Sequence, residues 1–331
     1  FRSTMSEKVE LVALLASCVL VATNAGRIIR EVAAEKDVVA LDKSGSQVED
    51  IAAEDLENAD ASAVVTIADR RAQDCIVNSL QKKFPALQIV GEEGDIPPGS
   101  DMIDIPDEAL ETWHQGRAPD VLAALQTVKA EALTWSSVCV WVDPLDGTKE
   151  FACKRVSACS VLIGITLDSV PFAGVILEPF RRSAAGDLGV PTVAVVGIGV
   201  VQSEGQLQAR PSEGLVLTTS VQDKPEVKAT LDTFMPAHPS THVLRMGACG
   251  NKLLRLLEGT ADVFMQGAGT CRWDSCAGEA LVRSVGGLLT DLSGEPYTYV
   301  KDASHANSRG LLAARTLEVH ALVMEHSQKA V

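Results

Sequence analysis

Residues 138–151 read VCVWVDPLDGTKEF, and this stretch decides the fold more than any other part of the chain. Its first five residues, Val138–Val142, are all apolar and predict a buried strand. The next four, DPLD at 143–146, place two carboxylates around a proline. We expect the proline to end the strand and fix a turn in which both carboxylates and the Leu145 carbonyl meet at one point. Gly147-Thr148 then opens a predicted helix or turn, whose free N–H groups suit a phosphate oxygen.

An ordinary Asp-Pro turn with a capping aspartate explains residues 143–146 equally well when they are taken alone. Other acidic residues have similar settings, however. Glu92 directly follows the predicted strand Leu87–Val90, Asp274 stands where a helix begins, and Asp69 opens another predicted helix. As a structural residue, Asp274 would simply be an N-cap. Oxygen donors without histidine or cysteine suit Mg²⁺ rather than zinc, and several such carboxylates are what a two-metal phosphoryl site requires.

Composition excludes several classes of function. The 331 residues are enough for two domains, and 46% apolar with 22% charged residues is typical of a folded chain. The net charge of −15 and only 4% aromatic residues argue against a binder of nucleic-acid polymers or of anionic membranes. Residues 45–61 hold six acids and residues 92–112 hold eight, with no Lys or Arg in either. Apart from Glu92, we interpret these acids as a solvated face or a mobile loop.

The order of the predicted elements indicates two halves. Residues 1–212 predict an α+β domain with an antiparallel meander, and residues 213–331 predict an α/β domain in which strands and helices alternate. A surface insertion is expected over 95–118. The predicted strands are Val64–Ile67, Leu87–Val90, Val138–Val142, Ser157–Leu167, Pro171–Leu177, Thr192–Gln202, Leu215–Thr218, Val243–Met246, Val263–Gln266 and Leu311–Ala313. The later predicted helices are Asp69–Phe84, Pro119–Leu133, Lys224–Phe234, Asn251–Leu257, Asp274–Val285 and Thr316–His326.

The apolar run Leu11–Ala22 has two interpretations. It could be the core of a secretory signal, but it is too short to span a bilayer, and Glu7 and Glu10 cancel the positive charge that such a signal needs. Its apolar spacing continues past Gly26, which favours a buried amphipathic helix. Eight cysteines without C-x-x-C or zinc spacing predict buried free thiols and a reducing, cytoplasmic location.

Three motifs in order carry a family resemblance. Gly91-Glu92-Glu93, residues 141–151 and Trp273-Asp274 resemble the signatures of the lithium-sensitive, magnesium-dependent phosphatases of the inositol monophosphatase superfamily. The Lys-Glu-Phe that follows Asp-Gly-Thr, with residues 244–247 and 250–252, is similar to the 3′(2′),5′-bisphosphate nucleotidase branch. The resemblance covers nearly the whole chain. It implies a layered α/β/α/β/α sandwich with the site between the two halves.

The resemblance also implies a reaction and its residues. Water activated by two or three Mg²⁺ ions would remove the 3′-phosphate of 3′-phosphoadenosine 5′-phosphate, or of its phosphosulfate relative, and Li⁺ would inhibit. The implied metal ligands are Glu92, Asp143, the Leu145 carbonyl, Asp146 and Asp274. Thr148 would relay a proton to Asp69. The implied substrate contacts are Gly147, Thr148, Thr219, Gln222, Ala248, Lys252 and Asp274, with Lys252 facing the 5′-phosphate.

This chain departs from the family pattern in three places. Gln222 stands where relatives have a histidine that helps to hold the nucleotide, residues 45–61 are longer and more acidic than usual, and Gly278 replaces a common proline. An inositol polyphosphate 1-phosphatase is the alternative enzyme. An inactive nucleotide or metal sensor is the alternative outside catalysis, although the presence of both Asp69 and Thr148 argues against it. The expected partner is a small phosphorylated substrate, and the expected state is a monomer or weak homo-oligomer.

Overall fold

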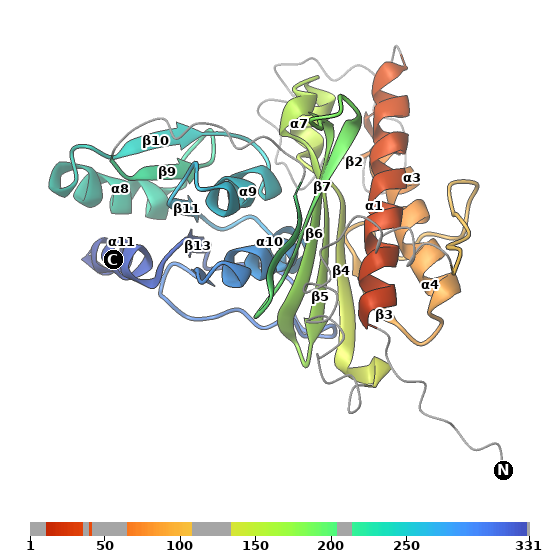
Figure 1. Cartoon of the computed structure of the whole chain (residues 1–331). Helices are drawn as coiled ribbons and strands as arrows, with labels where there is room; N and C mark the ends of the chain where they lie inside the picture. Colours follow the sequence, from red (N-terminus) through yellow and green to blue (C-terminus); the bar gives the residue numbers. More distant parts are fainter. Residues whose placement is uncertain (1–10, 36–39, 42–64, 108–133, 204–213, 330–331) are drawn as a thin grey trace.

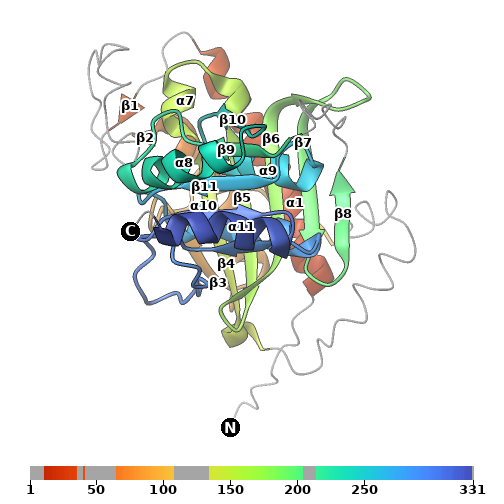
Figure 2. The same ribbon diagram turned by 90° about the vertical axis from the view of Figure 1, so that its left-hand side faces the viewer.

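The computed structural model describes residues 11–35, 40–41, 65–107, 134–203 and 214–329 (Figure 1). Strands gather into a six-stranded sheet of order β3-β4-β5-β6-β7-β8 and a five-stranded sheet of order β10-β9-β11-β13-β12. Helices α1, α3 and α4 cover one face of the six-stranded sheet, and α9 and α10 lie between the two sheets (Figure 1). Helices α8 and α11 lie side by side on the outer face of the five-stranded sheet (Figure 2). The expected layered sandwich is therefore confirmed.

The six-stranded sheet forms as the predicted meander, with two corrections. β3 is parallel to β4, and each later pair is antiparallel. The strand predicted over Thr192–Gln202 is wrong, because a turn with Gly197 at φ 83° divides it into a hairpin. The predicted strand over Ser157–Leu167 begins only at Ser160, after a short 3-10 turn at Val156–Ala158. The strands are β3 Gln88–Gly91, β4 Val138–Asp146, β5 Ser160–Leu167, β6 Val170–Arg182, β7 Leu188–Val195 and β8 Gly199–Ser203.

The alternation of strands and helices predicted for the C-terminal half is confirmed. One strand, β12, escapes prediction because three residues are too few to show a period. The strands are β9 Val216–Thr219, β10 His242–Arg245, β11 Val263–Gln266, β12 Leu288–Thr290 and β13 Leu311–Ala314. The helices are α8 Pro225–Ala237, α9 Gly250–Glu258, α10 Arg272–Ser284 and α11 Leu317–Lys329.

Helix α1 spans Leu11–Ala34, as its spacing predicts. By length and composition it could cross a membrane. Most of its apolar window is buried, however, and its buried side chains belong to the core that it forms with the six-stranded sheet. The interpretation as a core helix is therefore confirmed. All eight cysteines are free thiols, and six are buried, whereas Cys153 and Cys271 are partly exposed.

The helix predicted over Asp69–Phe84 is interrupted. It consists of α3 Ile67–Gln73, a π-helical turn Asp74–Asn78 and α4 Ser79–Lys83, and it ends before Pro85 as expected. A strand of two residues, β2 Val65–Thr66, precedes it and pairs with β1 Ala40–Leu41. Single π-turns inside helices are frequently found at functional sites.

Three acids of the 95–107 segment pair with basic side chains of this interrupted helix, although Asp104 and Asp107 remain largely exposed, as expected. Asp101 receives two hydrogen bonds of 2.9 Å from Arg71, and Asp104 and Asp107 pair with two lysines of α4. The segment therefore lies against the helix that carries Asp69. The acidic stretch 45–61, the rest of the insertion and the helix predicted over Pro119–Leu133 lie outside the described residues.

The glycine at 278 has a structural reason. α10 packs so closely on α9 that a Cβ on Gly278 would lie 2.1 Å from the Leu253 side chain. A larger residue at this position would require the Leu253 side chain to move. Gly278 thus permits the close contact of two helices whose N-termini both reach the site.

Candidate active site

Parallel pairing brings Glu92 beside Asp143. Gly91 of β3 is in register with Val142 of β4, so each acid follows an equivalent position on neighbouring strands. The Glu92 N–H donates to the Val142 carbonyl at 3.1 Å, which extends the pairing by one residue. The two apolar strands that each precede an acid are therefore neighbours in the sheet, and their acids, Glu92 and Asp143, lie side by side.

A β-bulge in β4 turns the side chains of Asp143 and Asp146 to the same face of the sheet. β4 continues to Asp146, so the expectation that the proline ends the strand is wrong. Three steps from Asp143 to Asp146 oppose only two steps on β5, from Leu162 to Ser160, so β4 carries one extra residue here. In a regular strand, side chains three residues apart point to opposite faces. The bulge removes that alternation, and Pro144 fits it because bulges tolerate a missing N–H.

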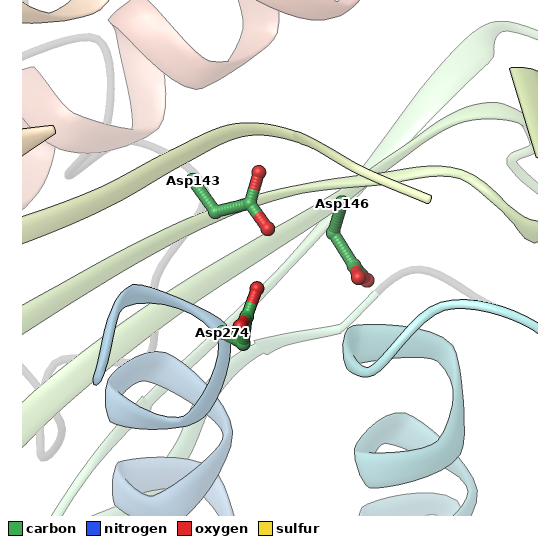
Figure 3. Close-up of side chains that lie close together, drawn as sticks. All are labelled: Asp143, Asp146 and Asp274. Carbon is green, nitrogen blue, oxygen red and sulfur yellow. The ribbon is translucent and has the colours of Figure 1, made fainter. Parts of the chain in front are cut away.

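Asp274 approaches these two aspartates from the other half of the chain. Figure 3 shows the three carboxylates turned toward one another, with Asp274 at the start of α10. One oxygen from each lies within 4.8 Å of the others. Asp274 is not itself the N-cap, which is a correction: Cys271 occupies that position, and its N–H donates to the Asp274 carboxylate at 2.5 Å.

Aromatic rings hold the backbone near two of these acids. The His305 ring lies 5.1 Å from that of Trp141 and 5.4 Å from that of Trp273, both edge to face. Trp141 is buried in β4 two residues before Asp143, and Trp273 directly precedes Asp274. The tryptophans of the two motifs thus help to set the distance between β4 and α10.

Hydrogen bonds to Asp146 connect the N-terminal half of the chain with the C-terminal half. Its carboxylate accepts hydrogen bonds from the Cys249 and Gly250 N–H groups at 2.8 and 2.7 Å, and from the Ser160 hydroxyl at 2.7 Å. These two N–H groups lie at the start of α9, where backbone donors have no partner within the helix and negative charge is favoured. A Cβ on Gly250 would lie 3.0 Å from the same carboxylate, so glycine permits the approach.

Burial raises the pKa of every acid in the cluster, and repulsion from neighbouring carboxylates adds to this for Glu92, Asp143 and Asp274. Burial, followed by the charges of neighbouring carboxylates, holds the pKa values of Glu92 and Asp143 well above their usual range. Burial raises the pKa of Asp274 to about 7 against the Cys271 hydrogen bond, and raises that of Asp146 despite its three donors. After burial, the charges of Glu92 and Asp274 are the next largest causes of the raised pKa of Asp143.

We expect the metal-free protein to lose stability as pH rises. Unfolded carboxyls titrate near pH 4, whereas burial raises the folded pKa values of Asp69 and Asp274 to about 6 and about 7. The folded state therefore binds more protons than the unfolded state between these limits, and its free energy of unfolding falls across that range. Each pKa unit corresponds to about 1.4 kcal/mol. In EDTA, the Tm should fall from about pH 5 to about pH 8, and Mg²⁺ should raise it more at the higher pH.

Asp143→Asn is the matched variant for this experiment, because it removes one charge from the middle of the cluster. We expect a shallower fall of Tm in EDTA and a smaller rise with Mg²⁺. Equal pH slopes in the two proteins would show that these carboxyls are not the source of the effect.

Asp69 and Thr148 are brought together from positions 79 residues apart. The Thr148 hydroxyl lies 2.8 Å from an Asp69 carboxylate oxygen and 3.0 Å from the Leu145 carbonyl, so it can donate to either. The other Asp69 oxygen accepts from the Thr66 N–H at 2.7 Å and the Thr66 hydroxyl at 2.5 Å. Burial raises the pKa of Asp69 to about 6 against these hydrogen bonds. Asp69 is thus a buried proton acceptor whose pKa lies close to neutral pH.

Thr148 begins the expected helix, α7 Thr148–Ala152. Gly147 precedes it in the left-handed region at φ 86°, a conformation that glycine adopts without steric cost. A Cβ on Gly147 would lie 3.0 Å from the Ala248 Cβ, so these two proposed substrate contacts lie side by side.

The remaining expected contacts are in different settings. Thr219 ends β9, buried, with its hydroxyl 3.3 Å from Asp223. Lys252 lies in α9, buried, and donates to the Met246 carbonyl at 3.3 Å; burial lowers its pKa while Asp146 and Asp274 oppose that shift. Gln222 is exposed on the segment between β9 and α8, so its contact with a nucleotide stays a prediction.

The donor set fits a hard divalent cation. It consists of carboxylates and a backbone carbonyl, which are the ligands that Mg²⁺ selects. Burial and then repulsion from neighbouring carboxylates raise the pKa of Asp143, and a cation offsets that repulsion. The sequence did not indicate two hydroxyls that donate to acids of the site, Thr66 to Asp69 and Ser160 to Asp146. Thr66 could have been found, because Thr-x-x-Asp has the spacing of a capping box.

Comparison with known proteins agrees with this geometry. The chain matches the model of the inositol monophosphatase family over residues 11–329. It is 35% identical over 325 residues to the 3′(2′),5′-bisphosphate nucleotidase 1 of Rattus norvegicus, which covers 97% of this chain and 96% of that protein. It is 36% identical over 314 residues to the Homo sapiens protein of the same name, covering 93% and 92%.

Solved structures show the same fold at lower identity. The extragenic suppressor protein suhB from Bartonella henselae aligns with a TM-score of 0.64 at 21% identity, covering 96% of this chain and all of that one. CysQ from Bacteroides thetaiotaomicron, a bacterial member of the inositol monophosphatase family, aligns with a TM-score of 0.62 at 21% identity, covering 92% and 98%.

Proposed function

Because the chain belongs to the inositol monophosphatase family, we infer that it is a magnesium-dependent phosphatase, a 3′(2′),5′-bisphosphate nucleotidase. Its reaction is hydrolysis of the 3′-phosphate of 3′-phosphoadenosine 5′-phosphate to AMP and phosphate. The phosphosulfate relative is a second proposed substrate. The observation that carries this proposal is the convergence of Asp143, Asp146 and Asp274 within 4.8 Å, at the end of the strand whose next helix begins with Thr148.

Glu92, Asp143, Asp146, Asp274 and the Leu145 carbonyl are the proposed ligands of two or three Mg²⁺ ions. When bound, Mg²⁺ supplies positive charge for the phosphate and makes water more acidic. The net charge of −15 would disfavour an anionic substrate, but bound Mg²⁺ offsets the negative charge at the site itself. Inhibition by Li⁺ is part of the proposal.

Thr148 and Asp69 move the proton. When the Thr148 hydroxyl donates to Asp69 at 2.8 Å, its lone pairs are free to accept from the attacking water. Water loses its proton to Thr148 Oγ1 while the proton of that hydroxyl passes to Asp69 Oδ1. The Thr66 N–H and hydroxyl both donate to the other carboxylate oxygen, Asp69 Oδ2. They hold the carboxylate in place and leave Oδ1 to accept from Thr148.

The N–H groups at Gly147 and Thr148 are the proposed contacts of the reacting phosphate. Lys252, Thr219, Ala248 and Gln222 are the proposed contacts of the nucleotide. Lys252 suits a 5′-phosphate because its ammonium group is buried, and a buried positive charge favours an anionic partner. We place the boundary of two domains at residues 212 and 213, with the site between them, and we propose a reducing, cytoplasmic location from the eight free thiols.

One assay tests this assignment. Phosphate release is measured from 3′-phosphoadenosine 5′-phosphate, its phosphosulfate, inositol 1,4-bisphosphate and inositol 1-phosphate, with Mg²⁺ and with added Li⁺. We expect Mg²⁺-dependent release, fastest from the adenosine bisphosphate and reduced by Li⁺. Faster release from inositol 1,4-bisphosphate would make the chain an inositol polyphosphate 1-phosphatase. No release from any of the four would leave a sensor as the remaining candidate.

A further inference from the structure

Gln73 is a fully buried amide that the proposed reaction does not use. It ends α3, one helical turn after Asp69, and none of its surface is exposed. Its Oε1 accepts from the Glu93 N–H at 3.0 Å, and its Nε2 donates to the Gly94 carbonyl at 2.6 Å. One partner is a donor and the other an acceptor, so the orientation of the amide is determined. Both partners belong to the turn that carries Glu92.

The chain beside this turn leaves room for the amide. A Cβ on Gly91 would lie 2.6 Å from Gln73 Oε1, so only glycine permits the amide to come this close. On the other side, the Glu92 N–H donates to the Val142 carbonyl of β4. The backbone of Glu92 is therefore held between β4, which carries Asp143, and α3, which carries Asp69.

The neighbouring residues of the same helix hold a different part of the loop. Asp74 accepts from the Gly99 and Asp101 N–H groups at 2.8 and 3.1 Å, and the Ser79 hydroxyl accepts from the Ile103 N–H at 2.9 Å. These contacts attach the loop well beyond Glu92. Gln73 differs from Asp74 and Ser79, because its two hydrogen bonds go to the two residues that directly follow Glu92.

We propose that Gln73 is a positioning residue for the metal centre, which fixes the Glu92 carboxylate at the place where a divalent cation completes its ligands. The inference rests on the proposed function for the role of Glu92 as a ligand. Glu92 is the member of the cluster that comes from a turn rather than from a long strand or helix. Without Gln73, the turn can adopt more conformations, and this conformational entropy is lost each time a cation binds.

Gln73→Met tests this role, because methionine has a similar length and volume but makes neither hydrogen bond. Binding of Mg²⁺ alone is measured by isothermal titration calorimetry without substrate. We expect the Kd to rise about tenfold or more, as is common when a group that orients a metal ligand is lost. Phosphate release should fall at limiting Mg²⁺ and recover to within about threefold at saturating Mg²⁺, with little change in the KM for the nucleotide.

Ser79→Ala is the matched control, since it removes one buried hydrogen bond between the same helical segment and the same loop. It should lower the Tm and leave the Mg²⁺ affinity within about twofold. Gly91→Ala provides a second route if Gln73→Met does not fold, because its Cβ displaces the Gln73 amide and should weaken Mg²⁺ binding in the same way.

The proposal is overturned if Gln73→Met binds Mg²⁺ as tightly as the unmodified protein, or if Ser79→Ala weakens binding equally. These outcomes are separate from a failure of the proposed function. If the unmodified protein releases no phosphate but Gln73→Met still weakens Mg²⁺ binding, the positioning role stands and the enzymatic assignment does not.

Discussion

Replacement of Asp143 by asparagine is expected to lower Mg²⁺-supported phosphate release by about a thousandfold or more. Burial and then the charges of Glu92 and Asp274 raise the pKa of Asp143, so these two acids are its close neighbours. Asparagine retains an oxygen for the Leu145 N–H, which now donates to Asp143 at 3.0 Å, but it removes the negative charge. Loss of several kcal/mol of metal-dependent stabilisation of the transition state corresponds to a fall of this size. Steady-state assays across a Mg²⁺ series measure it.

Misfolding can be separated from the loss of a ligand in this variant. The metal-free protein should be at least as stable as the unmodified one, because a charge that repels its neighbours has gone. Asp262→Asn is a suitable control: Asp262 is also buried and accepts the Val216 N–H at 2.8 Å, in the C-terminal sheet. It should lower the Tm and retain most of the turnover. Near-normal activity of Asp143→Asn would refute the metal-ligand role.

Thr148→Val should lower kcat by about a hundredfold to ten-thousandfold, which is the usual range for loss of a positioned proton-transfer group. Valine has almost the shape of threonine, but it cannot pass a proton to Asp69, 2.8 Å away. Mg²⁺ affinity measured by calorimetry should change little, because the carboxylates remain. Single-turnover measurements at saturating Mg²⁺ isolate the chemical step.

Thr148→Ser supplies the control for that experiment, since it retains the hydroxyl. Its activity should stay within about tenfold of the unmodified protein. If Thr148→Val and Thr148→Ser lose activity equally, the hydroxyl is not the route of the proton, and Asp69 must act by another path.

Much of the fold could be predicted from local patterns. The apolar run Val138–Val142 forms the first five residues of a nine-residue buried strand, and the spacing in Leu11–Ala22 continues into a buried helix. Such patterns report burial, which each segment shows by itself. A turn or bulge at residues 197–199 could be expected from the two glycines, but the division of Thr192–Gln202 into two strands was missed. The strand β12 was missed because three residues leave little signal.

The types of the candidate site residues were also evident from the sequence. Acids directly after apolar strands or at helix starts predicted oxygen ligands, and the family motifs indicated which acids to choose. The bulge at Pro144 was not predictable, because a proline after a strand more often ends it. Gln73 lies in an ordinary helical pattern, and its role follows only from the turn that packs against it.

By itself, the sequence determined most of the strands and helices, their order in an α+β half and an α/β half, and the chemistry of the donors, because apolar period and carboxylate type are properties of each segment. The layered arrangement was implied by the family resemblance. The tertiary structure alone decided which acids meet. Parallel pairing places Glu92 beside Asp143, a bulge turns Asp143 and Asp146 to one side, and the start of α10 supplies Asp274 from 128 residues beyond Asp146. Their raised pKa values arise from burial and from repulsion over a few ångströms, and both exist only after the chain has folded.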